Sequence, residues 1–213
     1  MEPESKSRTL FEEMGYKKGF KIIAGTDEAG RGPLAGPVVA AACIFPRYLI
    51  VEEIKDSKLL TVEKREELYH FLVDHPQIDL GIGIVENDRI DEINILQASL
   101  EAMEIAVKQL KASPDYLLVD GAQLPKTGIF SKGIVKGDKR SQSIGAASIL
   151  AKYTRDQIMI KHHGKWPEYG FDQHKGYGTK AHREGIEYHG LTVMHRMSFS
   201  TNKKALEKQM GWF

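Results

Sequence analysis

The chain has 213 residues and a formal net charge of +1, and 41% of its residues are hydrophobic, 28% charged and 8% aromatic. These values are typical of one globular domain with a small helical appendage, and they exclude a disordered chain, a collagen and a large multidomain protein. The longest apolar run, residues 38–45, is far too short to span a bilayer, and no segment of signal-peptide character opens the chain, so we expect a cytoplasmic protein.

Two apolar runs near the N-terminus predict neighbouring strands. The first covers residues 21–26 and the second covers residues 37–45, with a turn rich in glycine and proline between them. Cys43 is the only cysteine of the chain and lies inside the second run. We therefore expect Cys43 to pack in the core and expect no intrachain disulfide.

The middle of the chain predicts a helix, a strand and a second helix. Residues 61–75 carry apolar side chains at helical spacing behind Thr61, a candidate N-cap. Residues 78–84 alternate isoleucine or leucine with aspartate or glycine, which predicts a strand with one buried face. Residues 94–111 repeat apolar positions at close to helical spacing and predict a long helix.

The second half of the chain predicts two more strands and then mostly helices. The strands are predicted at residues 116–119 and 128–135, where apolar runs recur. A stretch rich in small residues follows Asp138 and predicts a helix that ends before Gly164. The remaining pattern predicts, in order, a loop and two short helices over residues 166–178, 179–189 and 199–210. This order of elements indicates a mixed α/β sheet covered by helices.

Four acids stand at the ends of predicted strands. They are Asp27 and Glu28 after the first strand, Asp120 after the fourth and Asp138 after the fifth. In open α/β sheets such ends face the functional crevice, and carboxylates gathered there repel one another unless protons or cations neutralise them. Oxygen ligands favour Mg²⁺ or Mn²⁺, and two such ions about 3.5–4 Å apart support displacement at a phosphodiester. The acids therefore indicate phosphoryl transfer.

Each acid taken alone also fits a structural role. Asp138 precedes a predicted helix and fits an N-cap, Asp120 fits a turn, and the first two acids fit a solvated loop. Asp156 differs, because it lies inside a predicted helix four residues after Lys152. We expect an ion pair between these two side chains rather than a metal ligand.

The glycine-rich turn of residues 30–36, GRGPLAG, matches neither the dinucleotide fingerprint nor the phosphate loop. Gly30 and Gly32 flank Arg31, so the backbone can approach a ligand closely while a cation is available for phosphate. That combination suits a sugar-phosphate backbone.

Charge is distributed unevenly along the chain. Residues 1–131 contain 15 Lys and Arg against 22 Asp and Glu, a net charge of −7, whereas residues 132–213 contain 15 against 7, a net charge of +8. The basic half fits a surface that binds a polyanion, although solvated faces give the same count. Six of the eight histidines lie in this half without a zinc-ligand pattern, and we interpret them as loop and basic-face residues.

The motif at residues 25–38, GTDEAGRGPLAGPV, resembles the signature of the ribonuclease HII family, the type 2 ribonucleases H. Further motifs follow in the family's order through residue 179: DSK at 56–58, INIL at 93–96, VDG at 119–121, KGD at 136–138, AASILAK at 146–152, RD at 155–156 and GYGT at 176–179. The resemblance implies a ribonuclease H-like mixed five-stranded sheet flanked by helices. We expect an N-terminal extension over residues 1–19, a catalytic domain over 20–190 and a C-terminal helical extension over 191–213.

The same resemblance implies an activity. Members hydrolyse the RNA strand of RNA–DNA hybrids and incise on the 5′ side of a ribonucleotide embedded in duplex DNA, leaving a 3′-hydroxyl and a 5′-phosphate. Two Mg²⁺ or Mn²⁺ ions are expected in the substrate complex. The residues that match the family's metal-binding catalytic acids are Asp27, Glu28, Asp120 and Asp138.

The resemblance also implies substrate contacts. The residues that match its 2′-hydroxyl sensor are Gly30, Arg31 and Gly32. Physically, the 2′-hydroxyl is the group that distinguishes RNA from DNA. Tyr177 matches the tyrosine that packs on sugar at the RNA–DNA junction, and Lys58 is expected to contact phosphate, as is Arg31. Alone, Tyr177 would fit a packed loop aromatic and Lys58 a surface charge. Asn94 fits a helix cap and also a contact to the substrate backbone.

The tail at residues 209–213, QMGWF, resembles the glutamine-plus-aromatic peptides that dock on bacterial sliding clamps, although a terminal Trp-Phe also packs on its own domain. Otherwise we expect a monomer. A non-catalytic nucleic-acid-binding module is the main alternative function, but four retained acids beside a polyanion would weaken such a module. A different metal phosphohydrolase on the same fold would need another substrate sensor.

Overall fold

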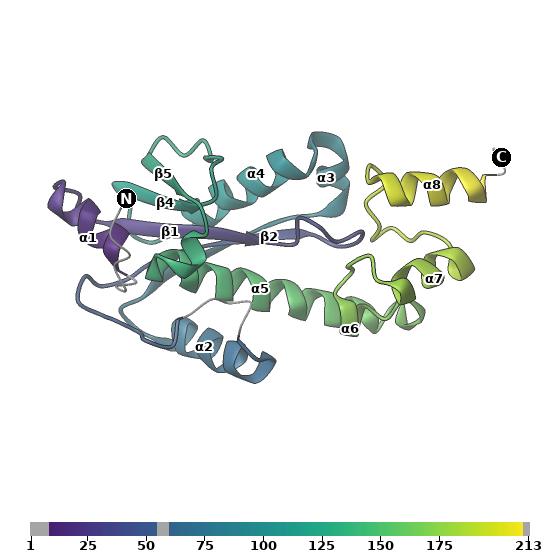
Figure 1. Ribbon diagram of the computed structural model, residues 1–213, viewed down its shortest axis with the longest axis horizontal. Coiled ribbons are helices and arrows are strands. Elements are labelled where there is room, and N and C mark those ends of the chain that lie inside the picture. The colour runs from purple at the N-terminus through teal and green to yellow at the C-terminus, as the bar shows by residue number, and fades with distance from the viewer. Residues whose placement is uncertain (1–8, 55–59, 211–213) are drawn as a thin grey trace.

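Five strands form one mixed sheet in the computed structural model, which describes residues 9–54 and 60–210 (Figure 1). The strands are β1 (Ile23–Ala29), β2 (Val38–Ile44), β3 (Asp79–Val85), β4 (Tyr116–Asp120) and β5 (Phe130–Ile134), in the sheet order β3-β2-β1-β4-β5. β2 is antiparallel to both β1 and β3, whereas β4 runs parallel to β1 and β5 parallel to β4. The predicted mixed five-stranded sheet is confirmed.

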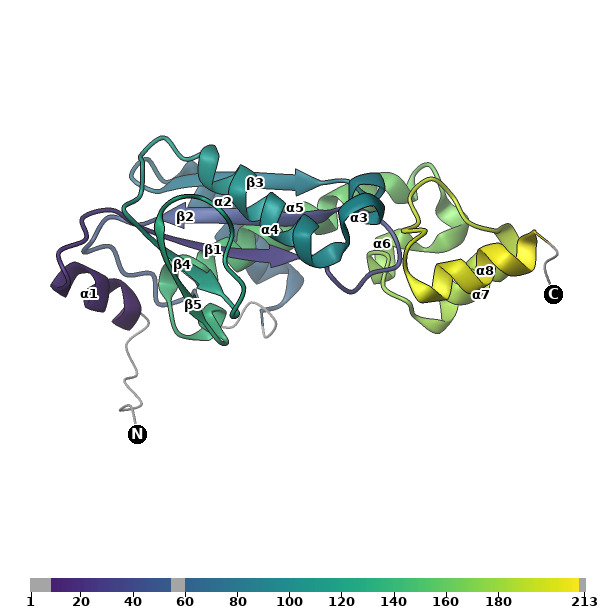
Figure 2. The same ribbon diagram turned by 90° about the horizontal axis from the view of Figure 1, so that it is seen from above.

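Helices cover both faces of the sheet. They are α1 (Leu10–Lys17), α2 (Val62–Asp74), α3 (Asn87–Ile93), α4 (Ile95–Lys108), α5 (Gln142–His163), α6 (Phe171–His174), α7 (Lys180–His189) and α8 (Ser200–Gln209). Ala102 and Ala106 of α4 belong to the core on one face, and Ala147 of α5 and Leu72 of α2 belong to the core on the other, where Cys43 is fully buried as expected. Figures 1 and 2 show α7 and α8 beyond one end of the sheet. No helix in the described part of the chain is long and apolar enough to cross a membrane.

The first strand is longer than predicted and corrects the placement of two acids. β1 continues through Asp27 and Glu28, which pair with Ala41 and Ala40 of β2, so both acids lie within the strand rather than after it. Thr26 strengthens the pairing, because its hydroxyl donates to the Ala41 carbonyl oxygen at 2.7 Å. The small side chains of β2 leave room for acids in the ladder, and the turn starts only at Gly30.

The third strand is covered on both faces rather than on one. Ile78 is buried, and Leu80 and Ile82 pack against the same core cluster, so the predicted isoleucine face does face the core, and the opposite face is covered as well. Gly81 and Gly83 are buried, whereas Ile84 is exposed. A Cβ atom on either glycine would collide with the carbonyl oxygens of Ala106 and Ala102. The two glycines therefore let α4 approach the sheet backbone closely, which large side chains at these positions would prevent.

Helix caps confirm most of the predicted helix starts. Thr61, Ser141 and Thr179 each accept a hydrogen bond from a backbone N–H of the first turn of α2, α5 and α7. The structure corrects the predicted loop of residues 166–178, which contains a 3₁₀ turn (Pro167–Tyr169) and α6. Their few residues provide too little periodicity to be recognised.

Besides α6, two further helices were not predicted. In α3 only Ile90 is buried, so its sequence carries no amphipathic pattern. In α1, Phe11 packs with Ile23 and Tyr116 in a core cluster at the edge of the sheet. The N-terminal segment from Leu10 onwards is thus packed on the sheet, while the proposed domain boundaries remain a prediction.

Candidate active site

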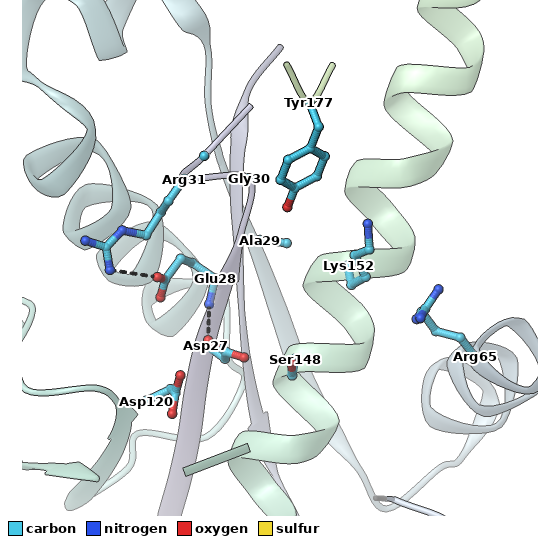
Figure 3. A pocket seen from close by; sticks show the side chains of 11 residues that line it. Asp27, Glu28, Ala29, Gly30, Arg31, Arg65, Asp120, Ser148, Lys152 and Tyr177 are labelled. Atoms are coloured by element: carbon cyan, nitrogen blue, oxygen red, sulfur yellow. Dashed lines mark hydrogen bonds and ion pairs between the residues drawn. The ribbon is translucent and has the colours of Figure 1, made fainter. Parts of the chain in front are cut away.

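The parallel pairing of β1 and β4 places a pocket at the carboxyl ends of these strands. The register pairs Thr26 with Val119, so Asp27 and Asp120 follow next along their strands. The pocket has a volume of about 290 Å³ and draws its walls from β1 and its turn, β4, α2, α5 and the loop before α7 (Figure 3). Its lining residues are Asp27, Glu28, Ala29, Gly30, Arg31, Gly32, Arg65, Asp120, Ser148, Lys152 and Tyr177.

Asp27 is the most constrained acid of this pocket. It is 5% exposed, and its Oδ1 accepts a hydrogen bond from the backbone N–H of Glu28 at 2.7 Å. Burial raises the pKa of Asp27 well above its usual range, and the negative charges of Glu28 and Asp120 raise it further, while a hydrogen bond from Ser148 opposes the shift. The hydrogen bonds that the protein donates to the Asp27 carboxylate are therefore too few to offset its burial and the repulsion from its neighbours.

Glu28 projects from the opposite face of β1 and pairs with Arg31. The Arg31 Nη1 atom lies 3.2 Å from Glu28 Oε1. Burial raises the pKa of Glu28, the Arg31 guanidinium lowers it, and the charge of Asp120 raises it. Since the Arg31 side chain is half exposed, this ion pair contributes little stability, and the guanidinium is free to exchange its partner.

Asp120 links the pocket to the segment that carries Asp138. Its Oδ1 accepts a hydrogen bond from the backbone N–H of Gly137 at 2.6 Å, in a 3₁₀ turn (Gly137–Lys139). Asp138 is 2% exposed and does not line the pocket. Ser141 rather than Asp138 caps α5, so the N-cap alternative for Asp138 is wrong. The structure therefore gathers Asp27, Glu28 and Asp120, with Asp138 one residue beyond the Asp120 contact.

The donor set of the pocket fits a hard divalent cation. Its acids offer only oxygen atoms, and a cation would relieve the repulsion that raises the pKa of Asp27. No group of three or more His, Cys, Asp or Glu side chains in residues 9–54 and 60–210 is arranged to hold a metal ion by itself. This arrangement suits Mg²⁺ or Mn²⁺, because Mg²⁺ commonly takes one or two carboxylates and completes its shell with water and substrate phosphate oxygens.

The glycine turn and Tyr177 face each other across the pocket mouth (Figure 3). Gly30 has a φ of +101°, and a Cβ atom there would collide with the Arg155 side chain. At Gly32 a Cβ atom would lie 3.7 Å from the Tyr177 ring. Lys152 Nζ lies 5.9 Å from the centroid of that ring, which is 44% exposed. A sugar entering between the loop and the ring would contact both.

Three polar lining residues were not predicted as site residues. Ser148 and Lys152 lie one turn apart on α5, a spacing that could have revealed them once Asp138 was placed before that helix. Lys152 also forms the expected ion pair with Asp156 at 2.7 Å. Arg65 comes from α2, and no motif indicated it.

One predicted contact, Asn94, is not part of the pocket lining. Asn94 caps α4, where its Oδ1 accepts hydrogen bonds from the backbone N–H groups of Leu96 at 3.0 Å and Gln97 at 3.2 Å. Its contact to substrate remains a prediction. Lys58 falls outside the described residues.

Two histidines correct the assignment of all histidines to loops and a basic face. His182 and His195 are fully buried, and their Nε2 atoms lie 3.1 Å apart. The Thr192 N–H donates to His195 Nδ1 at 2.9 Å, and His182 Nδ1 lies 3.0 Å from the Tyr177 carbonyl oxygen. These contacts assign one proton to each ring, so His195 Nε2–H donates to His182 Nε2 and His182 Nδ1–H donates to Tyr177. Burial lowers the pKa of each histidine to about 4, so the pair is neutral at pH 7.

Comparisons with known proteins agree with this geometry. The model of the ribonuclease HII family matches residues 24–202. The ribonuclease HII of Chlamydia trachomatis serovar L2 is 52% identical over 201 residues, which cover 94% of this chain and 92% of the relative. The crystal structure of ribonuclease H2 from Pyrococcus horikoshii OT3 has a TM-score of 0.75 at 29% identity, covering 88% of this chain and 98% of that chain.

Two further solved structures share the fold. The PCNA:RNase HII complex from Archaeoglobus fulgidus has a TM-score of 0.69 at 24% identity, covering 84% of this chain and 96% of that chain. Bst-RNase HIII in complex with Mn²⁺ has a TM-score of 0.66 at 19% identity, covering 91% of this chain and 72% of that chain.

Proposed function

This chain belongs to the ribonuclease HII family and is a type 2 ribonuclease H, an endonuclease that hydrolyses phosphodiester bonds, and we propose that it acts on ribonucleotides paired with or embedded in DNA. Its substrates are the RNA strand of RNA–DNA hybrids and single ribonucleotides in duplex DNA. Incision on the 5′ side of the ribonucleotide leaves a 3′-hydroxyl and a 5′-phosphate. The observation that carries the proposal is that one pocket combines three acids with the glycine turn and Tyr177.

We assign the metal-holding role to the four acids, and two Mg²⁺ or Mn²⁺ ions to the substrate complex. The all-oxygen donor set and the repulsion at Asp27 support this assignment, as does a structural neighbour that carries Mn²⁺. When bound, such ions supply an activated water and stabilise the leaving oxygen of the phosphodiester. The four acids are Asp27, Glu28, Asp120 and Asp138. The first three lie near the ends of two adjacent strands, so the sheet register fixes their separation, and Asp138 comes from the 3₁₀ turn that Asp120 contacts.

The residues around the acids orient the substrate. Gly30, Arg31 and Gly32 bring backbone close to the ribose, and the Tyr177 ring packs on the neighbouring sugar. Arg31 releases Glu28 and contacts phosphate, while Lys152 and Arg65 place positive charge on the opposite wall. The side chains of Lys58 and Asn94 extend these contacts along the substrate backbone. We propose that the enzyme acts as a monomer.

The C-terminal tail is proposed as a docking peptide for a sliding clamp. The complex of PCNA with the RNase HII of Archaeoglobus fulgidus supports a clamp as partner. Gln209 and Met210 begin the motif, and residues 211–213 lie outside the described part of the chain. Gln209 lies against Gly190 at the end of α7, so docking requires the end of α8 to open. Full-length protein should bind purified clamp and a version ending at Lys208 should not; equal lack of binding would refute the proposal.

The test of the main proposal is cleavage of an end-labelled DNA duplex that contains one ribonucleotide. With Mg²⁺ or Mn²⁺ we expect a single nick on the 5′ side, with a 3′ end that a DNA polymerase extends directly. EDTA should abolish the nick, and the same duplex without the ribonucleotide should stay intact. Binding without a nick in either metal would contradict the proposal and favour a non-catalytic module. Cleavage on the 3′ side with a cyclic phosphate would contradict the mechanism.

A further inference from the structure

Two buried arginines bind the backbone carbonyl oxygens of the glycine turn and of Pro37, which follows it. Arg196 is fully buried, and its guanidinium donates four hydrogen bonds, all to backbone carbonyl oxygens. The acceptors are Gly36 at 2.9 Å, Arg31 at 3.2 Å, Gly30 at 2.6 Å and Pro37 at 3.1 Å. Burial, with a smaller effect from the Arg155 charge, lowers the pKa of Arg196 to about 9, so it remains a cation at neutral pH.

The direction of two peptide groups follows from these contacts. All peptide bonds in the described residues are trans, so each N–H points away from the carbonyl oxygen of the same peptide group. Because the carbonyl oxygens of Gly30 and Arg31 point at Arg196, the N–H groups of Arg31 and Gly32 point away from it. Neither N–H donates a backbone hydrogen bond in the described chain, and both residues line the pocket. A peptide N–H is also a stronger hydrogen-bond donor when the carbonyl oxygen of the same peptide group accepts a hydrogen bond from a cation.

Arg196 belongs to a segment that the sequence places outside the catalytic domain. Its backbone N–H donates to the Leu34 carbonyl oxygen at 2.9 Å, and the Gly36 N–H donates to the Met194 carbonyl oxygen at 2.8 Å. The Phe199 ring covers the guanidinium at 5.1 Å. The start of the C-terminal extension is therefore joined to the glycine turn along its length.

We propose that Arg196 is a positioning residue for ribose recognition, which holds the N–H groups of Arg31 and Gly32 towards the substrate as hydrogen-bond donors to the 2′-oxygen. The inference rests on the proposed function. It assigns to the C-terminal extension a part in distinguishing ribose from deoxyribose.

Arg155 provides a matched control. It is 1% exposed and donates to the carbonyl oxygens of Ala35 at 3.0 Å, Pro37 at 2.9 Å and Lys175 at 2.9 Å. It therefore supports the same loop from a buried position and packs against Gly30, but its guanidinium hydrogen bonds go to other carbonyl oxygens than those of Gly30 and Arg31. Substitution of either arginine should weaken the glycine turn, whereas only substitution of Arg196 should weaken ribose recognition.

The experiment compares Arg196→Lys and Arg155→Lys with the wild type. Dissociation constants are measured in Ca²⁺ for a duplex with one ribonucleotide and for the same duplex in all-DNA form. The dissociation constant of the all-DNA duplex divided by that of the ribonucleotide duplex measures the preference for ribose. This ratio is independent of the fraction of folded protein. Arg196→Lys should lower this ratio about tenfold, the equivalent of one hydrogen bond, with little change in all-DNA binding, and Arg155→Lys should keep it. An unchanged ratio in Arg196→Lys, or an equal fall in both variants, would overturn the proposal.

A second measurement does not depend on the folding of a variant. In ¹⁵N-labelled wild type, the amide signals of Arg31 and Gly32 should shift and exchange more slowly with the ribonucleotide duplex than with the all-DNA duplex. Identical amide signals and exchange rates in the two complexes would overturn the proposal. Failure of the proposed function would show separately, as absence of cleavage by the wild type in Mg²⁺ and Mn²⁺.

Discussion

At Asp27, burial and the neighbouring negative charges disfavour the ionised carboxylate, and a bound cation would relieve this cost. Asp27 is buried beside two other carboxylates, and its side chain accepts hydrogen bonds from a serine hydroxyl and from one backbone N–H. Such a site is less stable empty than with an uncharged side chain, because burial and repulsion both disfavour the carboxylate. The same features make it a strong site for a divalent cation.

Substitution Asp27→Asn should therefore raise the melting temperature in EDTA. Adding Mn²⁺ should raise the melting temperature of the wild type, since a ligand that binds only the folded state stabilises it, and should raise that of the variant much less. Differential scanning fluorimetry with and without Mn²⁺ measures both effects. Equal metal-induced shifts in the two proteins would show that Asp27 does not hold the cation.

Tyr177 should act through its ring rather than its hydroxyl. The ring is half exposed beside Gly32 and Lys152, and none of the hydrogen bonds found within the described residues uses its hydroxyl. We expect Tyr177→Phe to keep kcat/KM within about threefold of the wild type. Tyr177→Ala should lower it about tenfold or more, because stacking contributes about 1–3 kcal/mol. Steady-state kinetics on the ribonucleotide duplex decide this, and equal losses in both variants would assign the role to the hydroxyl.

Among the elements, α1 is joined to the N-terminus of α5 by one buried acid. Glu12 Oε1 accepts hydrogen bonds from the hydroxyls of Ser141 at 2.6 Å and Ser143 at 2.7 Å and from the Ser143 N–H at 3.0 Å. These donors stand at the N-terminus of α5, where a negative charge is also favoured by the helix dipole. The contact joins the N-terminal segment to the helix that carries Ser148 and Lys152.

Glu12→Gln should lower the free energy of unfolding by about 2 kcal/mol, because charge-assisted hydrogen bonds are replaced by weaker ones. Urea denaturation followed by circular dichroism measures the change. The matched control is Glu13→Gln in the same helix. Glu13 forms a 3.8 Å ion pair with the half-exposed Arg47, which should contribute less than 1 kcal/mol. Similar effects of the two substitutions would contradict the assigned role of Glu12.

The buried histidine pair connects α7 to the segment before α8, and it should make stability depend on pH. Both rings are neutral in the folded state, with pKa values lowered to about 4 by burial, and His174 stacks on His182 with ring centroids 4.7 Å apart. In the unfolded chain these rings bind protons below about pH 6.5. The unfolded state then binds more protons, so stability falls as the pH falls from about 6.5 to about 4.

The expected loss is up to about 1.4 kcal/mol per pH unit for each ring in that window. Urea denaturation at pH 7, 6 and 5 measures this slope in the wild type and in His182→Gln. The variant should lose part of the slope, whereas His70→Gln, at an exposed position on α2, should keep it. A wild-type slope that His182→Gln leaves unchanged would refute the role of the pair.

Sequence patterns located the elements better than their boundaries and faces. Apolar runs located all five strands, but the end of β1 depends on pairing with the small residues of β2, which no local pattern reports. The second covered face of β3 depends on the close approach of α4 to Gly81 and Gly83, and a scheme that counts only large apolar residues finds the isoleucine face alone.

The same limit applies to the candidate site. Asp27, Glu28 and Asp120 were found because each stands near a strand end in a recognisable motif. Arg196 was not found, because its partners are backbone carbonyls as far as 166 residues away. Every residue has a backbone carbonyl, so the residue types do not indicate such a contact. The buried histidine pair was missed for a similar reason, since burial of an isolated histidine has no local signal.

At the scale of the whole molecule, the pocket needs both halves of the chain. The acidic first half supplies the glycine turn and the acids of β1 and β4, and the basic second half supplies Ser148, Lys152 and Tyr177. This division explains a chain whose net charge is close to zero but whose halves are strongly charged. The basic half can attract a polyanion while the acids remain clustered in the first half.

The central claim is that the clustered acids perform the chemistry rather than the binding. The most direct measurement is the single-turnover cleavage rate of a ribonucleotide-containing duplex in Mg²⁺, together with the affinity for that duplex. Asp27→Asn and Asp138→Asn should each lower the rate by about a thousandfold or more with affinity unchanged or improved, since metal catalysis contributes several kcal/mol. Asp74→Asn, at an exposed acid at the end of α2, should match the wild type. Wild-type rates in either of the first two variants would contradict the account.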